Sequence, residues 1–484
     1  MNPLKAIARR LLTARGFLPD FSDAALAEAN AASAHAADAD GTLTDQRRLL
    51  WASIDNDSSR DLDQLSVAQP LADGAVRILV AIADVAAVVE RDGPIDYHAQ
   101  NNTVTVYTAA GIFPMLPERL STDLTSLNEN EDRLAIVIEM DVAADGSLGN
   151  SNVYRARVRS RAQLAYDSVA AWLDDTQPAP PKVSAVAGLS EQLRVQDRVA
   201  QTLRKRRFEH GALSLQTPRS DAVFQGDTLT DLRPDTSNRG KELIEDFMVA
   251  GNGVVARFLS DRHFPSVRRV LRKPKRWERI TALASELGQS LPAEPDGSAL
   301  SRFLAKQRRE APEQFADLSL SVVKLLGRGE YVVDFPGQAA IGHFGLGAND
   351  YGHSTAPNRR FPDLLTQRLL KAAIAGEPVP YSAEQLTALA THCNEQEANA
   401  AKIERQVQKS AAAQLLSSHI GERFDGVVTG AADKGTWVRI NRPCTEGKIV
   451  QGAQGLDVGA RVRVELLRVD IEQGFIDFAH VGSR

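Results

Sequence analysis

The chain has 484 residues, 43% of them hydrophobic and 25% charged, which is the composition of a globular protein with room for about three domains. Its net charge of −5 excludes a protein that is basic over its whole surface, although it leaves room for a local basic groove. Two cysteines exclude a disulfide framework, and no apolar run is long enough for a membrane span or a signal peptide. We therefore expect a cytoplasmic protein.

The N-terminal part predicts helices. Residues 4–15 have the pattern of a basic amphipathic helix, which Gly16 and Pro19 end. Residues 22–38 are rich in alanine and helical by propensity. Because this segment is too small for a core of its own, we expect a cap that docks on the next domain, with a helix-turn-helix-like accessory as the alternative.

An acidic segment follows, in which four carboxylates fall within nine residues, at Asp55, Asp57, Asp61 and Asp63. If the chain is extended there, Asp61 and Asp63 project from one face, and a Ser-Ser stretch lets Asp55 return toward them. Two carboxylates 4 Å apart repel by roughly 4 kcal/mol at an effective dielectric of 20, so converging carboxylates need a cation or a shared proton. Oxygen ligands of this kind suit Mg²⁺ or Mn²⁺.

Two other interpretations of the acidic segment are a solvated loop and a calcium-binding loop. A solvated acidic loop is the commoner explanation of such a cluster when it is taken alone. A calcium-binding EF-hand loop starting at Asp55 needs glycine at its sixth position and glutamate at its twelfth. Arg60 and Ser66 stand there, so the EF-hand is excluded.

Residues 50–160 predict strands, among them 77–83 and 134–142, and the proline-containing residues 174–188 predict an exposed loop. Two basic stretches, 204–207 and 268–276, are each weak evidence for a groove. A long helix is predicted over 240–260, with apolar positions at Leu243, Phe247, Val254 and Phe258. The sequence then predicts a glycine-rich loop over residues 337–352 and two more helices, over 361–375 and 383–417.

Beyond Gly421 the periodicity changes to that of short strands. Five or so strands within about 60 residues predict a small β-barrel of the OB type. The strands we expect lie at residues 424–428, 436–440, 462–469 and 475–478.

Taken together and in order, several segments resemble the ribonuclease II (RNB) family of 3′→5′ exoribonucleases. The acidic segment resembles the family's first motif, Asp-x5-Asp-x-Asp-Asp, with Gln64 in place of the fourth aspartate. Leu215 is a second departure, at a position where an aromatic residue is common. The last region is similar to the RNA-binding OB domain of the largest small-subunit ribosomal protein. Other matching segments are Ile82-Ala83-Asp84-Val85, Tyr107 with Phe113-Pro114-Met115-Leu116-Pro117, Gly211-Ala212-Leu213, Leu243-Ile244-Glu245-Asp246-Phe247-Met248, His343-Phe344-Gly345-Leu346 through Tyr351 and Thr355 to Arg359, Arg360, Phe361 and Asp363, and Glu404-Arg405.

The resemblance implies an α+β fold. A mixed-sheet catalytic domain would cover residues 46–418, between a short helical N-terminal segment (1–45), where the family commonly has cold-shock domains, and an OB-fold RNA-binding domain (419–484). It implies a monomer, not bound to membranes, that degrades single-stranded RNA processively from the 3′ end to 5′-nucleoside monophosphates, in RNA decay or processing.

For the catalytic site, the resemblance implies that Asp55, Asp61 and Asp63 hold Mg²⁺, or Mn²⁺ in its place. Asp63 is the residue whose loss we expect to cost most activity. Arg359 would bind the scissile phosphate with its planar fork. Without the resemblance, an ion pair with Asp363 is the alternative for this arginine.

For RNA binding, the resemblance implies that Tyr107 stacks on a base near the 3′ end, and a buried core tyrosine is the alternative. Glu245 and Glu404 would contact the 2′-hydroxyl or the RNA end, or be ordinary surface glutamates. Phe424 and Trp437 would hold single-stranded RNA on the barrel, although Trp437 is equally suited to packing between strands.

Gln64 leaves three outcomes open: weaker metal binding, replacement by Asp57, or an impaired enzyme. We expect activity to be kept, because the other elements are present. Two other functions stay open. One is a non-catalytic single-strand RNA-binding protein of the same fold, and the other is an OB-containing scaffold for proteins, which would show no salt-sensitive RNA binding.

Overall fold

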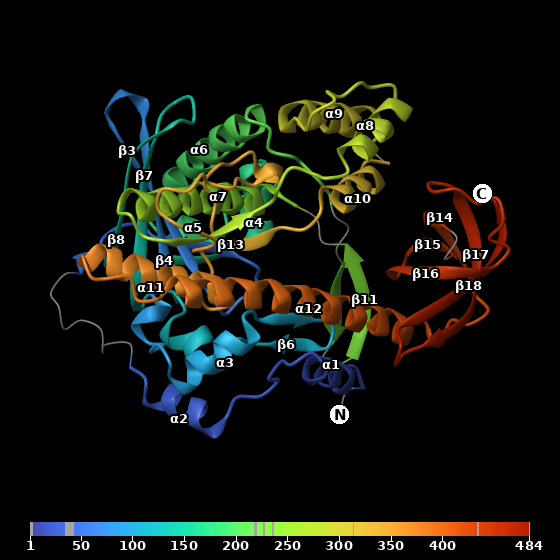
Figure 1. Ribbon diagram of the computed structural model, residues 1–484, viewed down its shortest axis with the longest axis horizontal. Coiled ribbons are helices and arrows are strands. Elements are labelled where there is room, and N and C mark those ends of the chain that lie inside the picture. Colours follow the sequence, from blue (N-terminus) through green and yellow to red (C-terminus); the bar gives the residue numbers. More distant parts are fainter. Residues whose placement is uncertain are drawn as a thin grey trace.

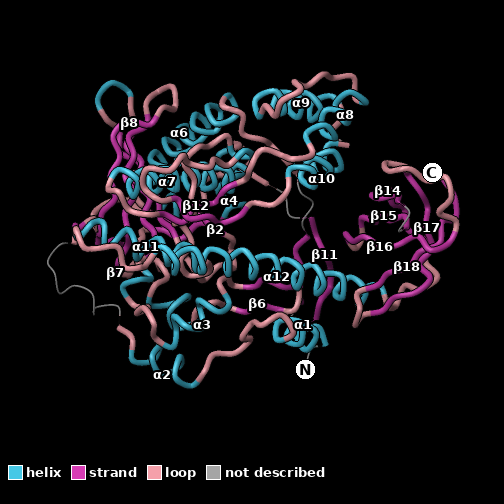
Figure 2. Tube along the Cα trace, in the orientation of Figure 1, coloured by secondary structure: helices cyan, strands magenta, loops and turns pink. Residues whose placement is uncertain are grey.

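A large sheet and a small barrel lie at opposite ends of the molecule, and one long helix runs between them (Figure 1). Most strands belong to these two parts, and short strands such as β6 (Gly111–Phe113) and β11 (Thr228–Pro234) lie beside the long helix between them (Figure 2). The computed structural model describes residues 3–33, 43–216, 220–225, 228–234, 237–312, 314–432 and 435–483. No helix in this part of the chain is long and apolar enough to cross a lipid bilayer.

The large sheet has seven strands in the order β1-β8-β7-β4-β3-β2-β9. Two pairs, β1–β8 and β2–β9, are parallel and the others are antiparallel, so the sheet is mixed as expected. The central strand β4 is apolar at almost every position because both of its faces are covered. The strands are β1 (Thr44–Asp45), β2 (Ala52–Asp55), β3 (Gln64–Pro70), β4 (Val76–Ala83), β7 (Asp132–Val142), β8 (Leu148–Arg159) and β9 (Ala162–Ala165).

Two long helices cover the sheet. Helix α6 (Leu189–Glu209) packs on β3, and α7 (Arg239–Asp261) packs on α6, β7 and β8. All four apolar positions predicted for the second helix are buried. Shorter helices α4 (Tyr166–Leu173) and α5 (Pro181–Ala185) precede them. The prediction of an exposed loop over 174–188 is therefore wrong for residues 181–185, because α5 forms there and buries Val183.

Helix α11 (Phe361–Ala375) has the predicted bounds, and α12 (Ala383–Leu416) ends one residue earlier than predicted. A capping box of Ser382 and Gln385 starts α12. A hairpin of β5 (Val106–Thr108) and β6 (Gly111–Phe113) packs beside this helix (Figure 1). Other short elements are α3 (Pro94–Asn102), the 3₁₀ turns Ala72–Gly74, Val85–Ala87 and Phe344–Leu346, and the π-helical turn Arg119–Leu124.

Three further helices form a separate unit with its own small core around Trp277, Ile280, Phe303 and Phe315. We had no expectation for this part of the chain. The unit consists of α8 (Trp277–Glu286), α9 (Gly297–Glu310) and α10 (Phe315–Leu326). Two small sheets lie elsewhere, formed by β10 (Ser220–Gln225) with β11 (Thr228–Pro234) and by β12 (Ser266–Val270) with β13 (Glu330–Asp334).

The C-terminal strands close into a barrel in the order β14-β15-β16-β18-β17, as an OB-type fold requires. The prediction of a C-terminal barrel is confirmed, although β16 had not been expected. Within the segment Lys434-Gly435-Thr436-Trp437-Val438, which resembles the ribosomal OB domain, Lys434 lies outside the described residues. The strands are β14 (Arg423–Ala432), β15 (Gly435–Asn441), β16 (Cys444–Gln451), β17 (Arg461–Asp470) and β18 (Phe475–Ser483).

The N-terminal helix α1 (Pro3–Thr13) buries its apolar side in the same cluster as the barrel core and the last turns of α12. Its Arg10 also forms an ion pair with Glu472 between β17 and β18. Helix α2 (Asp23–Ala31) is shorter than the predicted 22–38. Ala32 is already extended, and residues 34–38 lie outside the described part of the chain.

Candidate active site

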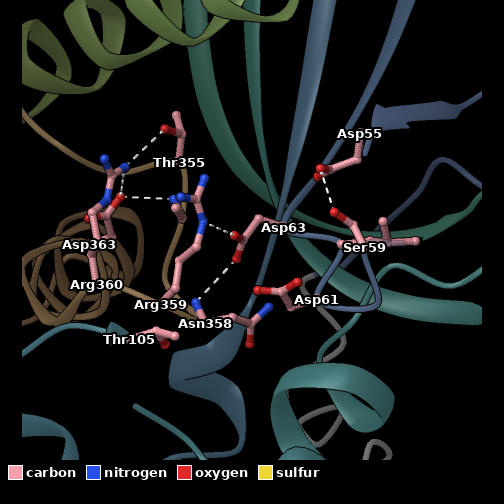
Figure 3. Close-up of polar contacts among 12 residues, drawn as sticks. Asp55, Ser59, Asp61, Asp63, Thr105, Thr355, Asn358, Arg359, Arg360 and Asp363 are labelled. Carbon is pink, nitrogen blue, oxygen red and sulfur yellow. Dashed lines mark hydrogen bonds and ion pairs between the residues drawn. The ribbon is translucent and has the colours of Figure 1, made fainter. Parts of the chain in front are cut away.

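The acidic segment forms the loop between β2 and β3. Asp55 is the last residue of β2, and its Oδ1 accepts hydrogen bonds from the backbone N of Asn56 and from Oγ of Ser59, both at 2.7 Å. These bonds close a tight turn of the kind that aspartate favours. Figure 3 shows the side chain of Asp55 turned toward Ser59 and set apart from those of Asp61 and Asp63.

Asp63 lies at the centre of the site, directly before β3, and its side chain is only 2% exposed. Its two oxygens accept hydrogen bonds from the backbone N of Asn358 at 3.2 Å and from Nε of Arg359 at 3.0 Å (Figure 3). Burial raises the pKa of Asp63 to about 6, against the opposing charge of Arg359, and the charge of Asp61 adds to the rise. The site thus holds a carboxylate whose negative charge is only partly compensated.

The carboxylate of Asp61 is also partly buried, and its pKa is raised as well. Burial raises its pKa, and repulsion by Asp55 adds to the rise. The hydroxyl of Tyr107 donates a hydrogen bond to its Oδ2 at 3.2 Å. Each of the three predicted aspartates therefore lies within electrostatic range of another, and an excess of negative charge gathers at this edge of the sheet.

The two neighbouring arginines before α11 diverge. Arg359 pairs with Asp63 and its side chain is 44% exposed, whereas Arg360 pairs with the fully buried Asp363 at 2.7 Å and contacts Thr355. The alternative of an ion pair between Arg359 and Asp363 is therefore wrong. Because Asp63 binds Nε of Arg359, the terminal nitrogens of that guanidinium are left to bind another group.

Tyr107 projects from the β5–β6 hairpin toward Asp61 and is 42% exposed, so the alternative of a buried core tyrosine is wrong. Its backbone N donates to Oε1 of Glu404 on α12 at 3.2 Å. Glu404 therefore anchors the hairpin, and its contact with RNA stays a prediction.

Tyr166 is a residue of the site that we missed. It begins α4, directly after Ala165, which is paired with Asp55 between β9 and β2. Burial and the charge of Asp55 raise the pKa of Tyr166. Nothing in the local sequence marks it, because its position depends on the parallel pairing of two strands far apart in the chain.

The donor set fits a hard cation in kind. Asp55, Asp61 and Asp63 offer only oxygen ligands, and burial, with repulsion between the carboxylates, raises the pKa values of Asp61 and Asp63. A bound cation would offset both effects. Within the described residues, however, no three His, Cys, Asp or Glu side chains are grouped as a ready-made metal site. Gln64 is buried in β3 and brings no charge.

The other predicted RNA-binding residues lie elsewhere. Glu245 on α7 forms an ion pair with Arg207, in which Nη2 of the arginine lies 3.1 Å from Oε1 of the glutamate. Phe424 packs against Phe478 of the barrel core, with ring centroids 6.2 Å apart. Trp437 is partly exposed, and the ammonium of Lys448 lies 6.0 Å from its ring centroid.

The two basic stretches differ in their surroundings. Arginines of 204–207 pair with carboxylates of the same domain, so that stretch offers little free charge. In the stretch 268–276, Arg268, Arg269 and Arg272 also pair with carboxylates. Arg272, Lys273 and Lys275 line a cleft of about 860 Å³ beside the glycine-rich loop, together with the acidic residues Glu294 and Asp296.

Comparisons with known proteins agree with this arrangement. Residues 43–376 match the RNB domain, and residues 422–481 match the RNase II-type exonuclease C-terminal S1 domain. Ribonuclease R of Escherichia coli K12 is 29% identical over 477 residues, which cover 91% of this chain and 57% of that protein. Exoribonuclease 2 of Salmonella paratyphi B is 31% identical over 348 residues, which cover 71% of this chain and 52% of that protein.

Solved structures share the fold. RNase R of Mycoplasma genitalium in complex with ribose methylated single-stranded RNA superposes with a TM-score of 0.88 at 22% identity, covering 99% of this chain and 78% of that one. Yeast Ssd1, described as a pseudonuclease, superposes with a TM-score of 0.73 at 15% identity, covering 96% of this chain and 58% of that one. The chain spans a little over half the length of the curated relatives it matches. With more than half of its residues matched, the chain belongs to the RNB domain family.

Proposed function

We propose that this chain is a metal-dependent 3′→5′ exoribonuclease that hydrolyses single-stranded RNA to 5′-nucleoside monophosphates. The observation that carries the proposal is the meeting of Asp61, Asp63, Tyr107 and Arg359, which come from three separate segments of the chain. The ribonuclease names of the relatives support the same reaction. The fold alone does not decide it, since a pseudonuclease shares it.

Arg359 is our candidate for binding the scissile phosphate. Asp63 fixes one edge of its guanidinium through Nε, and the terminal nitrogens remain able to form two parallel hydrogen bonds to phosphate oxygens. The position is open enough for a ligand to reach, because 44% of the side chain is exposed. Asp63 would orient this fork while its own charge balances it.

Asp55, Asp61 and Asp63 would hold Mg²⁺, or Mn²⁺ in its place. When bound, the ion supplies an activated water and neutralises the phosphate. Gln64 lowers the negative charge of the set, so we expect a higher metal requirement rather than loss of activity. Asp57 is exposed in the same loop and is the residue available to compensate.

Tyr107 would stack on a base next to the carboxylates, with a gain of roughly 1–3 kcal/mol that tolerates any base. The strand upstream would lie along the cleft beside the glycine-rich loop or reach the barrel (419–484) with Trp437, while the catalytic domain (46–418) holds the 3′ end. Duplex RNA would then stall digestion. We extend the proposal to processive action in RNA decay or processing by a cytoplasmic monomer.

The test is to incubate the purified chain with 5′-labelled single-stranded RNA in Mg²⁺, Mn²⁺ or EDTA, beside Asp63→Asn. Shortening to one small limit product that needs metal and is absent in the variant supports the exonuclease. Binding of RNA without shortening in either metal contradicts it and favours a non-catalytic RNA-binding protein of the same fold.

A further inference from the structure

The β5–β6 hairpin has one buried and one exposed face. Val106 and Phe113 are paired across the hairpin and are 1% and 7% exposed. The next pair, Tyr107 and Ile112, faces the other way and is 42% and 63% exposed. Paired residues project from the same face of a hairpin, so Ile112 lies beside Tyr107 on the face that carries the tyrosine toward Asp61.

The backbone hydrogen bonds show how close the two side chains are. The backbone N–H of Tyr107 points away from β6, since it donates to Glu404 on α12. Tyr107 and Ile112 therefore form a non-hydrogen-bonded pair, the type in which the two Cα atoms are about 4.5 Å apart and the side chains approach most closely. The result is one continuous apolar surface that starts at the carboxylates and extends away from them.

An isoleucine exposed to this extent is costly to leave in water when no partner covers it. Because Ile112 lies beside Tyr107 on the same face of the hairpin, a strand that has a base on Tyr107 and continues over β6 brings the neighbouring base onto Ile112.

We propose that Ile112 and Tyr107 together form the surface on which bases near the 3′ end of the RNA stack, Ile112 contacting the base next to the one on Tyr107. This inference rests on the proposed function, because it needs RNA at this site. An aliphatic side chain forms no hydrogen bond with a base edge, so the strength of the contact depends on the size of the base and not on its hydrogen-bonding groups. Adenine, with its larger face, gains more from it than uracil.

Binding of short oligomers tests the proposal without turnover. In EDTA, Ile112→Ala should raise the Kd for a four-nucleotide oligo(A) about 5-fold, which corresponds to about 1 kcal/mol. The rise should be smaller for oligo(U), and Ile112→Trp should lower the Kd, because stacking on an aromatic ring is stronger. In metal, Ile112→Ala should leave a longer limit product from 5′-labelled RNA.

Two controls separate the contact from indirect effects. Val379→Ala removes another exposed apolar side chain, 36% exposed and located between α11 and α12, and should change nothing. Oligomers with an abasic residue at one position near the 3′ end should lose the effect of Ile112→Ala at one position only, as a double-mutant cycle requires. That position should neighbour the one at which Tyr107→Ala loses its effect.

The outcomes distinguish this inference from the proposed function. If Tyr107→Ala weakens binding but both Ile112 variants bind as the parent does, the inference is wrong and the exonuclease stands. The inference is also wrong if the abasic residue leaves the effect of Ile112→Ala unchanged at every position. If the Ile112 effects appear but no RNA is shortened in metal, the stacking surface stands and the proposed reaction fails.

Discussion

Asp63→Asn should stabilise the metal-free protein at pH 8. The side chain is 2% exposed, and burial raises its pKa from the ordinary 3.8 to about 6. At 1.36 kcal/mol per pKa unit, ionised Asp63 costs the folded state about 3 kcal/mol, after the help of Arg359 is included. Asparagine avoids this cost and still accepts the hydrogen bond from the backbone N of Asn358.

The sign of the pH dependence follows from linkage. An acid whose pKa is raised on folding destabilises the folded state above that pKa, and the cost disappears as the pH falls through 6 toward 4. The advantage of Asp63→Asn should therefore shrink from about 3 kcal/mol at pH 8 to about half of that at pH 5. With an unfolding entropy of about 2.1 cal/mol/K per residue, 1 kcal/mol corresponds to roughly 1–2 °C in the unfolding midpoint of a domain as large as residues 46–418.

Calorimetry in EDTA at pH 8 and pH 5 measures this difference. Asp57→Asn, in the same loop but exposed, is the matched control and should change little. Mg²⁺ at about 100 times its Kd should stabilise the parent by about 2.7 kcal/mol and Asp63→Asn by less. A variant less stable than the parent at pH 8 in EDTA, or a gain of equal size at pH 5, would refute the reasoning.

Three further changes have defined outcomes. Arg359→Lys should lower single-turnover cleavage by at least about 100-fold because lysine cannot form the bidentate contact, and near-normal rates would contradict the phosphate role. Gly347→Ala should lower the unfolding midpoint more than Gly337→Ala. Both glycines have positive φ, which costs alanine about 1–2 kcal/mol of folding free energy at either position. Only at position 347 would the added Cβ also lie within 2.8 Å of backbone atoms. Equal losses would show that steric contact is not the cause. Asp363→Ala leaves Arg360 without its buried partner and should cost about 3 kcal/mol or more in urea unfolding, with Asp363→Asn intermediate.

Local patterns predicted the helices α1, α2, α7, α11 and α12 and most of the barrel, but not the helices between β6 and α7 or those of the three-helix unit. The four apolar positions of α7 are all buried because spacing near 3.6 residues defines one helix face. Strand β16 was missed because its two buried positions are Gly447 and Ile449. Glycine has no apolar side chain, so the strand lacks the alternation of apolar and polar residues that marks a buried face. The structure gives the reason for this glycine: a Cβ there would lie 2.7 Å from the carbonyl oxygen of Ile476.

The site was predictable only where its residues are close in sequence. Asp61 and Asp63 were found from their spacing. The partner of Asp63 is 296 residues away, and only the family motif, not any local property, drew attention to Arg359. The divergence of Arg359 and Arg360 toward different aspartates depends on how the chain enters α11, which composition and periodicity do not encode.

If the hairpin and the barrel bind one RNA strand as proposed, the length of α12 sets a minimum substrate length for binding at both ends of the molecule. From Glu404, which holds the hairpin, to Leu416, after which the chain enters the barrel, the helix advances about 18 Å. A stacked strand covers that distance with roughly five nucleotides. Shorter fragments would contact only the hairpin. The affinity for RNA should therefore rise in a step, and not gradually, once the strand is long enough to contact both the hairpin and the barrel.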